Sequence, residues 1–309
     1  MPISEMHGRK PPALSNVLAA SKRSRTIGPT QKAIRRFIKQ PLGMAGLIIL
    51  LLEMVLALVA PQIATYDPIE QRLSDKLKPP SWEHPMGIDH LGRDVFSRVV
   101  YGTRNTLGGS LMSLFLLSLI GIVVGGIAGY TGGILDSILM RITDGLLSFP
   151  YLVLALGLAA AFTPNLFTVV FAVSVTWWGH YARVIRGMVM STREAVYVES
   201  SRAMGAGHFR ILTRHVLPNI MAPILVLSSL DLGLVVLAVA ALSYLGLGIQ
   251  PPAPEWGMML NESRLFMFLA PHIMIFPGLM IFVTVLAANL VGDALRDAFD
   301  PRGRIRKIR

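Results

Sequence analysis

Two carboxylates stand inside long apolar stretches of the chain, where carboxylates are rare. Glu53 lies within the stretch 42–63, and Asp231 lies within the stretch 220–242. A carboxylate inside a membrane span is costly unless it is neutral, paired or hydrated, so each of these residues is a candidate functional residue. For Asp231, lining a translocation path and packing are equally open. For Glu53, a protonated or hydrogen-bonded packing role is favoured over proton transfer.

Other patterns that carry chemistry are weak or absent from the sequence. The chain has no cysteine, which excludes disulfides and thiolate metal sites. His84 and His90 flank Asp89, but two histidines with this spacing and no further ligand do not indicate a metal site. No catalytic set of residues has a supporting context, and the phosphate-binding pattern G-x-x-x-x-G-K-[ST] does not occur. The sequence therefore predicts no catalytic residue, cofactor site or metal site, and we do not expect an enzyme.

The most informative polar segment is VESSRAMGAGHFRILTRHVLPN, residues 198–219. Glu199 begins a short predicted helix, where its charge suits the positive end of the helix dipole. Gly205 and Gly207 interrupt that helix, and a second short helix is predicted over His208–Val216. The segment is therefore predicted to be a short, bent element between two hydrophobic spans.

The same segment carries apolar side chains at helical spacing, and these are Val198, Phe209, Ile211 and Leu212. An ordinary basic loop would not need them. Apolar residues outside the membrane need a partner surface, so the pattern favours docking of a soluble protein over a solvated loop.

Composition indicates a helical membrane protein. Hydrophobic residues make up 53% of the 309 residues and charged residues only 15%, whereas soluble domains carry about 25% charged residues. The mean hydropathy is +0.56. The net charge of +11 is better explained by basic cytoplasmic loops than by nucleic-acid binding.

Six membrane spans are predicted from apolar runs of bilayer length. They cover residues 42–63, 107–130, 138–161, 166–185, 220–242 and 270–291. The third is the weakest, because Arg141 and Asp144 lie near its start. Pro150 inside it is expected at a packed kink.

The distribution of charge predicts the orientation. Both ends of the chain and the connection 183–214 are rich in arginine and lysine, whereas the segment 65–104 balances six basic with six acidic residues. By the positive-inside rule, both termini and the connection 183–214 are cytoplasmic. The first forty residues form a basic tail with a short interfacial helix on the anionic cytoplasmic leaflet, in preference to a transit peptide. No cleavable signal is predicted.

Two segments fall on the outer side, 65–104 and 248–271. The second is too apolar for a free loop, so we expect it on the outer surface or at a cavity mouth, with Trp256 at the membrane interface.

In the second span, Gly121, Gly125 and Gly129 recur at every fourth position. Such a face allows close helix packing, which we expect within the chain rather than at a subunit interface or a pore.

The segment 198–219 resembles the EAA loop of ATP-binding-cassette importer permeases. Glu199, Gly205, Leu217 and Pro218 match that pattern at the right offsets. Ser200 and Ser201 replace its two alanines, and His215 replaces its isoleucine. The full predicted coupling site comprises Glu199, Ser200, Ser201, Arg202, Ala203, Gly205, Ala206, His215, Leu217 and Pro218, with Asp231 as a candidate for the translocation path.

Three further segments resemble the dipeptide, oligopeptide and nickel branch of this family. They are HPMGIDHLGRDVFSRVVYGTR (84–104), LSYLGLGIQPPAPEWGMML (242–260) and FPGLMIFVTVLAANLVGDALRDAFDPR (276–302). The first span with its polar extension places the chain with the second permease of such systems.

The resemblance implies an all-α polytopic membrane protein with six helices and the type I ABC importer permease fold, located in the cell inner membrane. It also implies four kinds of partner or ligand: two ATP-binding cassette subunits, which bind ATP in place of this chain, a second homologous permease, an extracytoplasmic solute-binding protein, and a dipeptide or oligopeptide substrate. Nickel complexes and other small solutes remain alternatives.

The expected domain organisation is a basic cytoplasmic tail (1–40), the first span with its extracytoplasmic segment (41–103), a five-helix permease core (104–293) that contains the coupling loop (194–219), and a second basic tail (294–309).

Two other classes of function stay open. A proton-coupled secondary transporter would use Glu53 and Asp231 as a relay but leaves the segment 198–219 unexplained. A membrane scaffold without transport leaves the segment 248–271 unexplained.

Overall fold

The computed structural model describes residues 29–300, and these residues are arranged almost entirely in helices. The helices are α2 (Pro29–Ile38), α3 (Pro41–Leu58), α4 (Ala60–Ile63), α5 (Val95–Thr131), α6 (Gly133–Leu147), α7 (Tyr151–Ala160), α8 (Leu166–Arg193), α9 (Val196–Ala203), α10 (His208–Ile211), α11 (Leu217–Tyr244), α12 (Trp256–Ser263) and α13 (His272–Phe299). Short 3₁₀ turns cover Leu73–Asp75 and Arg264–Phe266, and a π-helical turn covers Leu212–Val216. Within this part of the chain the only β pairing is an isolated bridge between Ile88 and Asp94. The predicted all-α class is confirmed.

Four helices are long and apolar enough to cross a membrane, namely α3, α5, α13 and the continuous run from α10 to α11. The pair α6 and α7 counts as a fifth span if it is taken as one, although it is bent by 86°. The bend occurs at Pro150, which has no backbone N–H to continue a helix. Helix α8 has the length of a span but is more polar, so the predicted count of six spans is not confirmed.

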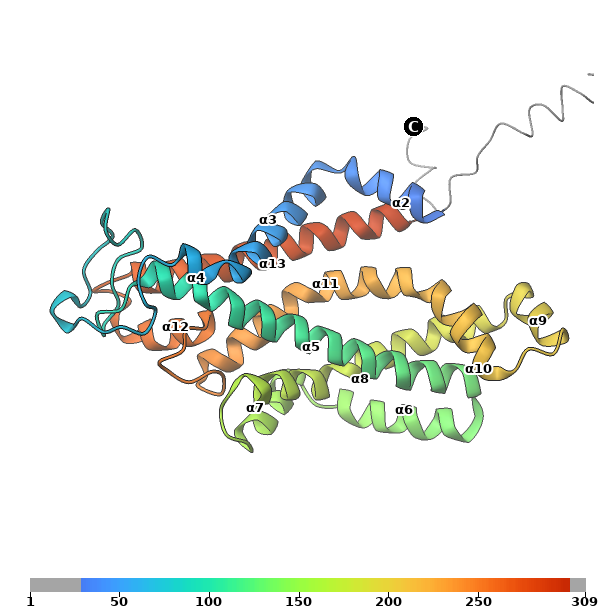
Figure 1. The fold of residues 1–309 in the computed structure, drawn as a ribbon. Coiled ribbons are helices and arrows are strands. Elements are labelled where there is room, and N and C mark those ends of the chain that lie inside the picture. The colour runs from blue at the N-terminus through green and yellow to red at the C-terminus, as the bar shows by residue number, and fades with distance from the viewer. Residues whose placement is uncertain (1–28, 301–309) are drawn as a thin grey trace, which may run out of the picture.

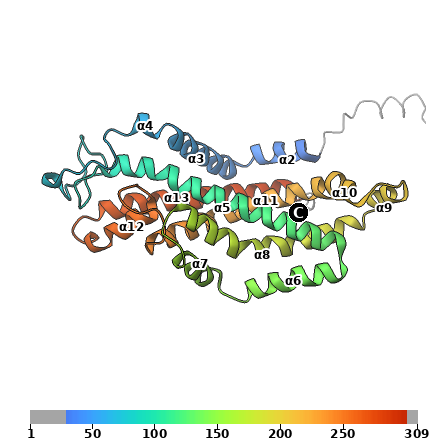
Figure 2. The same cartoon turned by 60° about the horizontal axis from the view of Figure 1, so that its bottom comes forward.

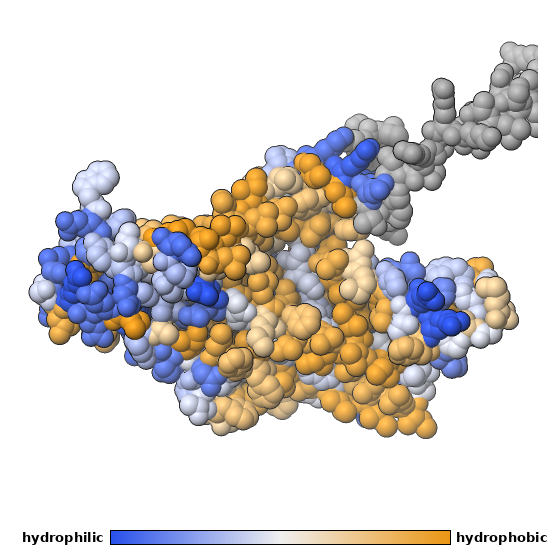
Figure 3. Space-filling model, in the orientation of Figure 1, coloured by the Kyte–Doolittle hydropathy of each residue, from blue (hydrophilic) through white to orange (hydrophobic). Residues whose placement is uncertain are grey.

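The surface of the molecule matches a bilayer environment. Figure 3 shows a hydrophobic band across the middle and hydrophilic surface at both ends. In Figure 1 and Figure 2, α3 and α6 lie on opposite sides of the group formed by α5, α8 and α11. Helices α2, α9 and α10 are at one end, and α12 with the segment between α4 and α5 is at the other.

The packing of α5 on α8 depends on the three spaced glycines. A Cβ atom at Gly121 would collide with Tyr181, one at Gly125 with the carbonyl oxygen of Ala182, and one at Gly129 would lie 2.7 Å from the carbonyl oxygen of Arg186. The absence of side chains therefore brings the two backbones into contact. The prediction that this stripe packs within the chain is confirmed.

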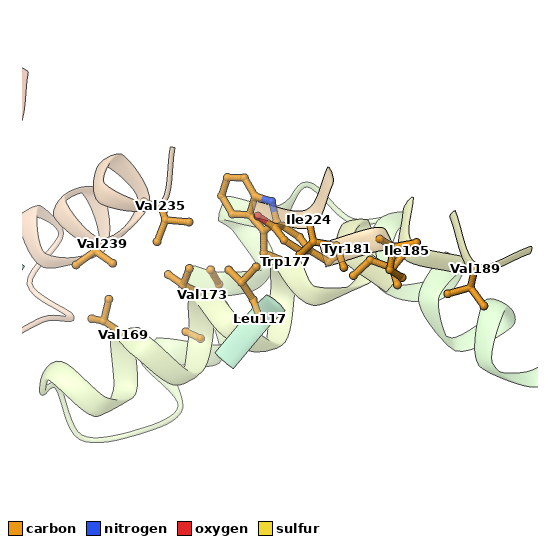
Figure 4. Packing of buried hydrophobic residues seen from close by; sticks show 14 of the residues in the cluster. Leu117, Val169, Val173, Trp177, Tyr181, Ile185, Val189, Ile224, Val235 and Val239 are labelled. Carbon is orange, nitrogen blue, oxygen red and sulfur yellow. The ribbon is translucent and has the colours of Figure 1, made fainter. Parts of the chain in front are cut away.

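The largest apolar cluster fills the space between α5, α8 and α11. Leu117, Tyr181 and Val235, one from each of these helices, are fully buried in it, as Figure 4 shows. The cluster extends to Val198 of α9 and Ile211 of α10. The short elements at the end of the molecule are therefore part of the same core as the long helices.

The end of the molecule that carries α12 is held by buried polar contacts. Asp94 caps α5, since its carboxylate accepts a hydrogen bond from the Ser97 amide at 2.8 Å, and this cap extends the helix well beyond the predicted start at Leu107. The prediction that Trp256 lies at the membrane interface is wrong. Its ring is fully buried inside the protein, where the indole nitrogen donates to the carbonyl oxygen of Val99 at 3.0 Å.

Candidate functional site

The connection between α8 and α11 forms a bent element at one end of the molecule (Figure 1). Helix α9 ends in a Schellman motif, in which the Gly205 amide donates to the carbonyl oxygen of Arg202 and the Ala206 amide donates to that of Ser201. Gly205 has φ +85°, a conformation that favours glycine. This glycine reverses the chain, as predicted, so that α10 returns toward the core.

The apolar residues of this element divide into two sets. Val198 and Ile211 are fully buried in the core of the chain itself, and Leu212 is half-buried against it. The expectation that these three residues need a partner surface is therefore wrong. Phe209 remains 81% exposed. Two further apolar side chains of this element are also exposed, Met204 at 81% and Val196 at 78%.

The exposed set lies on a polar end of the protein, away from the hydrophobic band (Figure 3). Large apolar side chains in such a place indicate contact with another protein. The buried set fixes α9 and α10 to α8 and α11. A force applied to the exposed face would consequently reach both long helices.

A pocket of about 520 Å³ opens beside the exposed set. It is lined by Tyr130, Arg193, Glu194, Glu199, Arg202 and His208. The lining thus combines two carboxylates with two guanidinium groups, and it includes the glutamate that the sequence singled out. A partner that fits this pocket needs polar or charged groups of its own to pair with these side chains.

The position of the pocket is fixed by contacts to the end of α5. Arg193 donates hydrogen bonds to the carbonyl oxygens of Gly129 and Tyr130 at 3.0 and 3.1 Å. A cation at the C-terminal end of a helix is favourable because that end carries partial negative charge. The Tyr130 hydroxyl also lies 3.1 Å from Nδ1 of His208. Helices α5, α8 and α10 therefore meet at this point.

The other predicted coupling residues lie along the same connection. Ser200 and Ser201 each bond back to a carbonyl oxygen four residues earlier, and Ser201 is buried whereas Ser200, Arg202 and Ala203 are exposed. Ala206, His215 and Leu217 are half-buried, and Pro218 is exposed in the first turn of α11. The structure thus brings Glu199 to Ala206 together at the tip of the element and leaves His215 to Pro218 at the start of α11.

Asp231 lies in the middle of α11, on the face toward α5 and α8. Its carboxylate interacts with the Tyr181 hydroxyl, which is 3.5 Å from the Ser228 hydroxyl. Ser118 of α5 completes this polar group at 3.4 Å from Ser228. Asp231 itself is buried, and its Oδ2 atom has no hydrogen-bond partner among the described residues.

A groove of about 790 Å³ between α11 and α13 offers a different surface. Pro223 and Val226 of α11 line it together with Asp293 and Asp297 of α13. Asp231 is not among the lining residues, and its carboxylate contacts Tyr181 of α8 instead.

The end of the molecule that carries α12 holds a buried charge network that the sequence did not reveal. Arg93 pairs with Asp89 at 2.6 Å and with Glu262 at 3.1 Å, and Arg98 pairs with Glu262 at 2.9 Å. Both arginines are almost fully buried. The equal numbers of acidic and basic residues in the segment 65–104 were the only sign of ion pairing in the sequence. The pairing with Glu262 was not predictable, because Glu262 is distant in sequence.

The histidines near this network have separate roles. His84 bonds to Asp94 at 2.8 Å, and the His90 ring stacks on Phe266. Burial lowers the pKa of His90, more than the negative charges of Asp89 and Glu262 raise it. His90 is therefore neutral at pH 7 and packs as an aromatic ring.

Comparison with known proteins places this architecture in a family. Residues 121–305 match the family model described as binding-protein-dependent transport system inner membrane component. Residues 28–80 match the model for the N-terminal TM domain of oligopeptide transport permease C.

Relatives of known name agree with both matches. The glutathione transport system permease protein GsiD of Pectobacterium atrosepticum is 43% identical over 89% of this chain and 91% of its own length. The protein of the same name from Shigella boydii is 40% identical over 94% and 96%. The nickel transport system permease protein NikC of Escherichia coli is 41% identical over 83% and 92%. The chain therefore belongs to the family of binding-protein-dependent transport system inner membrane components, as a permease of the dipeptide, oligopeptide and nickel type.

Proposed function

We propose that this chain is one of two permease subunits of an ATP-driven importer, and that it forms half of the translocation path. Two ATP-binding subunits supply the energy, and the chain itself binds no ATP and catalyses no reaction. An extracytoplasmic binding protein delivers the solute to the end that carries the segments 65–104 and 248–271. Both termini and the α8–α11 connection are cytoplasmic, and the protein is located in the cell inner membrane.

One observation carries this proposal. The α8–α11 connection exposes Phe209, Met204 and Val196 at a polar end of the protein while Val198 and Ile211 fix it to the core. This is what a coupling element needs, because it must bind a soluble partner on one side and transmit displacement to membrane helices on the other. Closure of the ATP-binding subunits would move the element, and α8 and α11 would move with it.

The proposed substrate class is a dipeptide, an oligopeptide or a related peptide. The relatives named for glutathione transport support a peptide-like solute. The relative named for nickel transport has nearly the same identity to this chain and supports a nickel complex as the second candidate.

Transport by the reconstituted complex tests the proposal. The vesicles contain the chain with its second permease, ATP-binding subunits and binding protein. They should accumulate labelled peptide when ATP is supplied on the side of the membrane that carries the ATP-binding subunits. A proton ionophore should leave this uptake intact. Uptake that needs a proton gradient and continues without the ATP-binding subunits would establish the secondary-transporter alternative instead. Competition by unlabelled peptide and by nickel separates the two substrate classes.

A further inference from the structure

Helix α2 is attached to the protein by one face only. Ala33 and Phe37 are buried against α13, where they contact a small apolar cluster around Ala294. Arg36 reinforces this contact, since its guanidinium donates to the carbonyl oxygens of Ala298 at 3.4 Å and Asp300 at 3.2 Å. These bonds occupy carbonyl groups at the end of α13 that have no partner within that helix.

The face of α2 next to this buried face is apolar and uncovered. Ile34 and Ile38, one helical turn apart, are 52% and 58% exposed. Leu42 at the start of α3 is also exposed, so the apolar surface of α2 continues onto the exposed apolar side chains of α3. Since α3 is a candidate membrane span, this continuity places the face of α2 at the boundary of the bilayer.

Basic side chains border this apolar face. Lys32, Arg35 and Lys39 are exposed, and residues 29–40 contain no acidic residue. Among the contacts of residues 29–300, no hydrogen bond or ion pair engages these three side chains. An apolar stripe with unpaired cations beside it is the pattern of a helix that lies in a membrane interface and attracts anionic lipid.

We propose that α2 is a binding surface for the headgroups of anionic phospholipids in the leaflet at this end of the protein. Ile34 and Ile38 enter the acyl boundary, and Lys32, Arg35 and Lys39 contact the phosphate groups. That this leaflet is the cytoplasmic one rests on the proposed function, because the end is identified by α9 and α10. Lipid bound here would contact α2 while Arg36 holds α2 on α13, so the lipid would also fix the position of α13.

Lipid quenching in vesicles tests the surface without any transport partner. The chain has no native cysteine, so Ile34→Cys can carry a single fluorophore in the full-length protein. The labelled protein is placed in phosphatidylcholine vesicles with an equal fraction of either brominated phosphatidylglycerol or brominated phosphatidylcholine. We expect stronger quenching by the brominated phosphatidylglycerol, and this preference should decline as salt is raised because the attraction is electrostatic.

Charge variants identify the residues responsible. The triple variant Lys32→Gln, Arg35→Gln, Lys39→Gln should lose the preference for phosphatidylglycerol, with about a fivefold loss of relative affinity for each charge removed. The matched control is Lys76→Gln, Arg104→Gln, Arg264→Gln, which removes the same charge from exposed side chains outside α2 and should keep the preference.

Equal quenching by the two lipids in the labelled protein that keeps all of its basic residues would overturn the proposal. The same conclusion follows if the control variant loses the preference as completely as the α2 variant. If quenching shows no preference and the label becomes protected only when the ATP-binding subunits are added, α2 binds protein rather than lipid. Because none of these measurements requires uptake, a failed transport assay and a failed lipid assay are separate results.

Discussion

The hydroxyl oxygen of Thr284 lies 2.9 Å from Oε1 and 3.0 Å from Oε2 of Glu53, and 2.8 Å from the carbonyl oxygen of Met280. A hydroxyl group has one hydrogen to donate, so it cannot satisfy three acceptors. If Glu53 is protonated, one carboxyl oxygen donates to Thr284 and Thr284 donates to the carbonyl oxygen of Met280, so two of the three contacts become hydrogen bonds. Glu53 is buried between two apolar helices, α3 and α13, and such surroundings favour the neutral form.

The first prediction follows from this hydrogen-bonding arrangement. Glu53→Gln should leave ATP-driven uptake close to normal, because the amide nitrogen of glutamine can donate to Thr284 in place of the carboxyl. Glu53→Leu removes the donor and should lower stability by about 1 kcal/mol. Uptake is measured in vesicles with ATP and a proton ionophore, and stability is measured from the thermal midpoint in detergent.

The alternative function makes the opposite claim for Glu53. A carboxyl that carries protons cannot be replaced by an amide, so uptake by Glu53→Gln would collapse. If the ionophore abolished wild-type uptake while ATP remained high, the importer assignment would be withdrawn in favour of a proton-coupled transporter.

The second prediction concerns Gly205 in the α8–α11 connection. A Cβ atom there would meet open space, and the positive φ adds a strain of only about 1 kcal/mol, so Gly205→Asp should still fold and assemble in the membrane. The substitution adds bulk and a negative charge on the exposed tip, and we expect it to abolish ATP-driven uptake. Membrane content is measured by immunoblot and uptake in vesicles. Normal uptake by this variant would remove the coupling assignment of the connection.

An alanine pair separates backbone strain from surface contact at the same place. Gly205 has positive φ and Gly207 does not, and both have open space around the Cβ position. Gly205→Ala should therefore cost about 1 kcal/mol of local stability, whereas Gly207→Ala should cost little. Equal effects of the two alanines on uptake would indicate that contact, and not the turn conformation, determines coupling.

The third prediction uses the close approach of α5 and α8. Gly125→Ala places a methyl group against the carbonyl oxygen of Ala182, so the helices must separate, at a cost of about 1–3 kcal/mol. Gly126→Ala, on the next residue, meets open space and should change stability by less than about 0.5 kcal/mol. Thermal unfolding of the detergent-solubilised protein, followed by circular dichroism, measures both. Equal midpoints for the two variants would contradict the glycine-dependent packing.

The sequence predicted features that depend on local pattern. The turn at Gly205 follows from a glycine between two helical segments, and the packing of Gly121, Gly125 and Gly129 follows from their spacing. Both are properties of neighbouring residues. The helical class followed in the same way from the length and hydropathy of the apolar runs.

Features that depend on distant contacts were not predictable in this way. Val198 and Ile211 have the spacing of a docking face, but they are buried because the same spacing also suits the core between α8 and α11. Trp256 suits a membrane interface by type, yet its partner Val99 lies on another helix. The pairing of Arg93 and Arg98 with Glu262 likewise joins segments that no local pattern connects.

The fourth prediction fixes the orientation of the chain in the membrane. Because the native chain has no cysteine, single cysteines can be introduced at Lys78, Arg202, Asn16 and Arg306. Asn16 and Arg306 lie outside the described residues. The Lys78 side chain forms only an exposed pair with Asp75, so its loss should cost little stability. A membrane-impermeant maleimide should label position 78 in intact spheroplasts and the other three only in inside-out vesicles, since positive charge is retained on the cytoplasmic side. Labelling of position 78 from the cytoplasmic side alone would reverse the orientation and, with it, the assignment of the α8–α11 connection to the ATP-binding subunits.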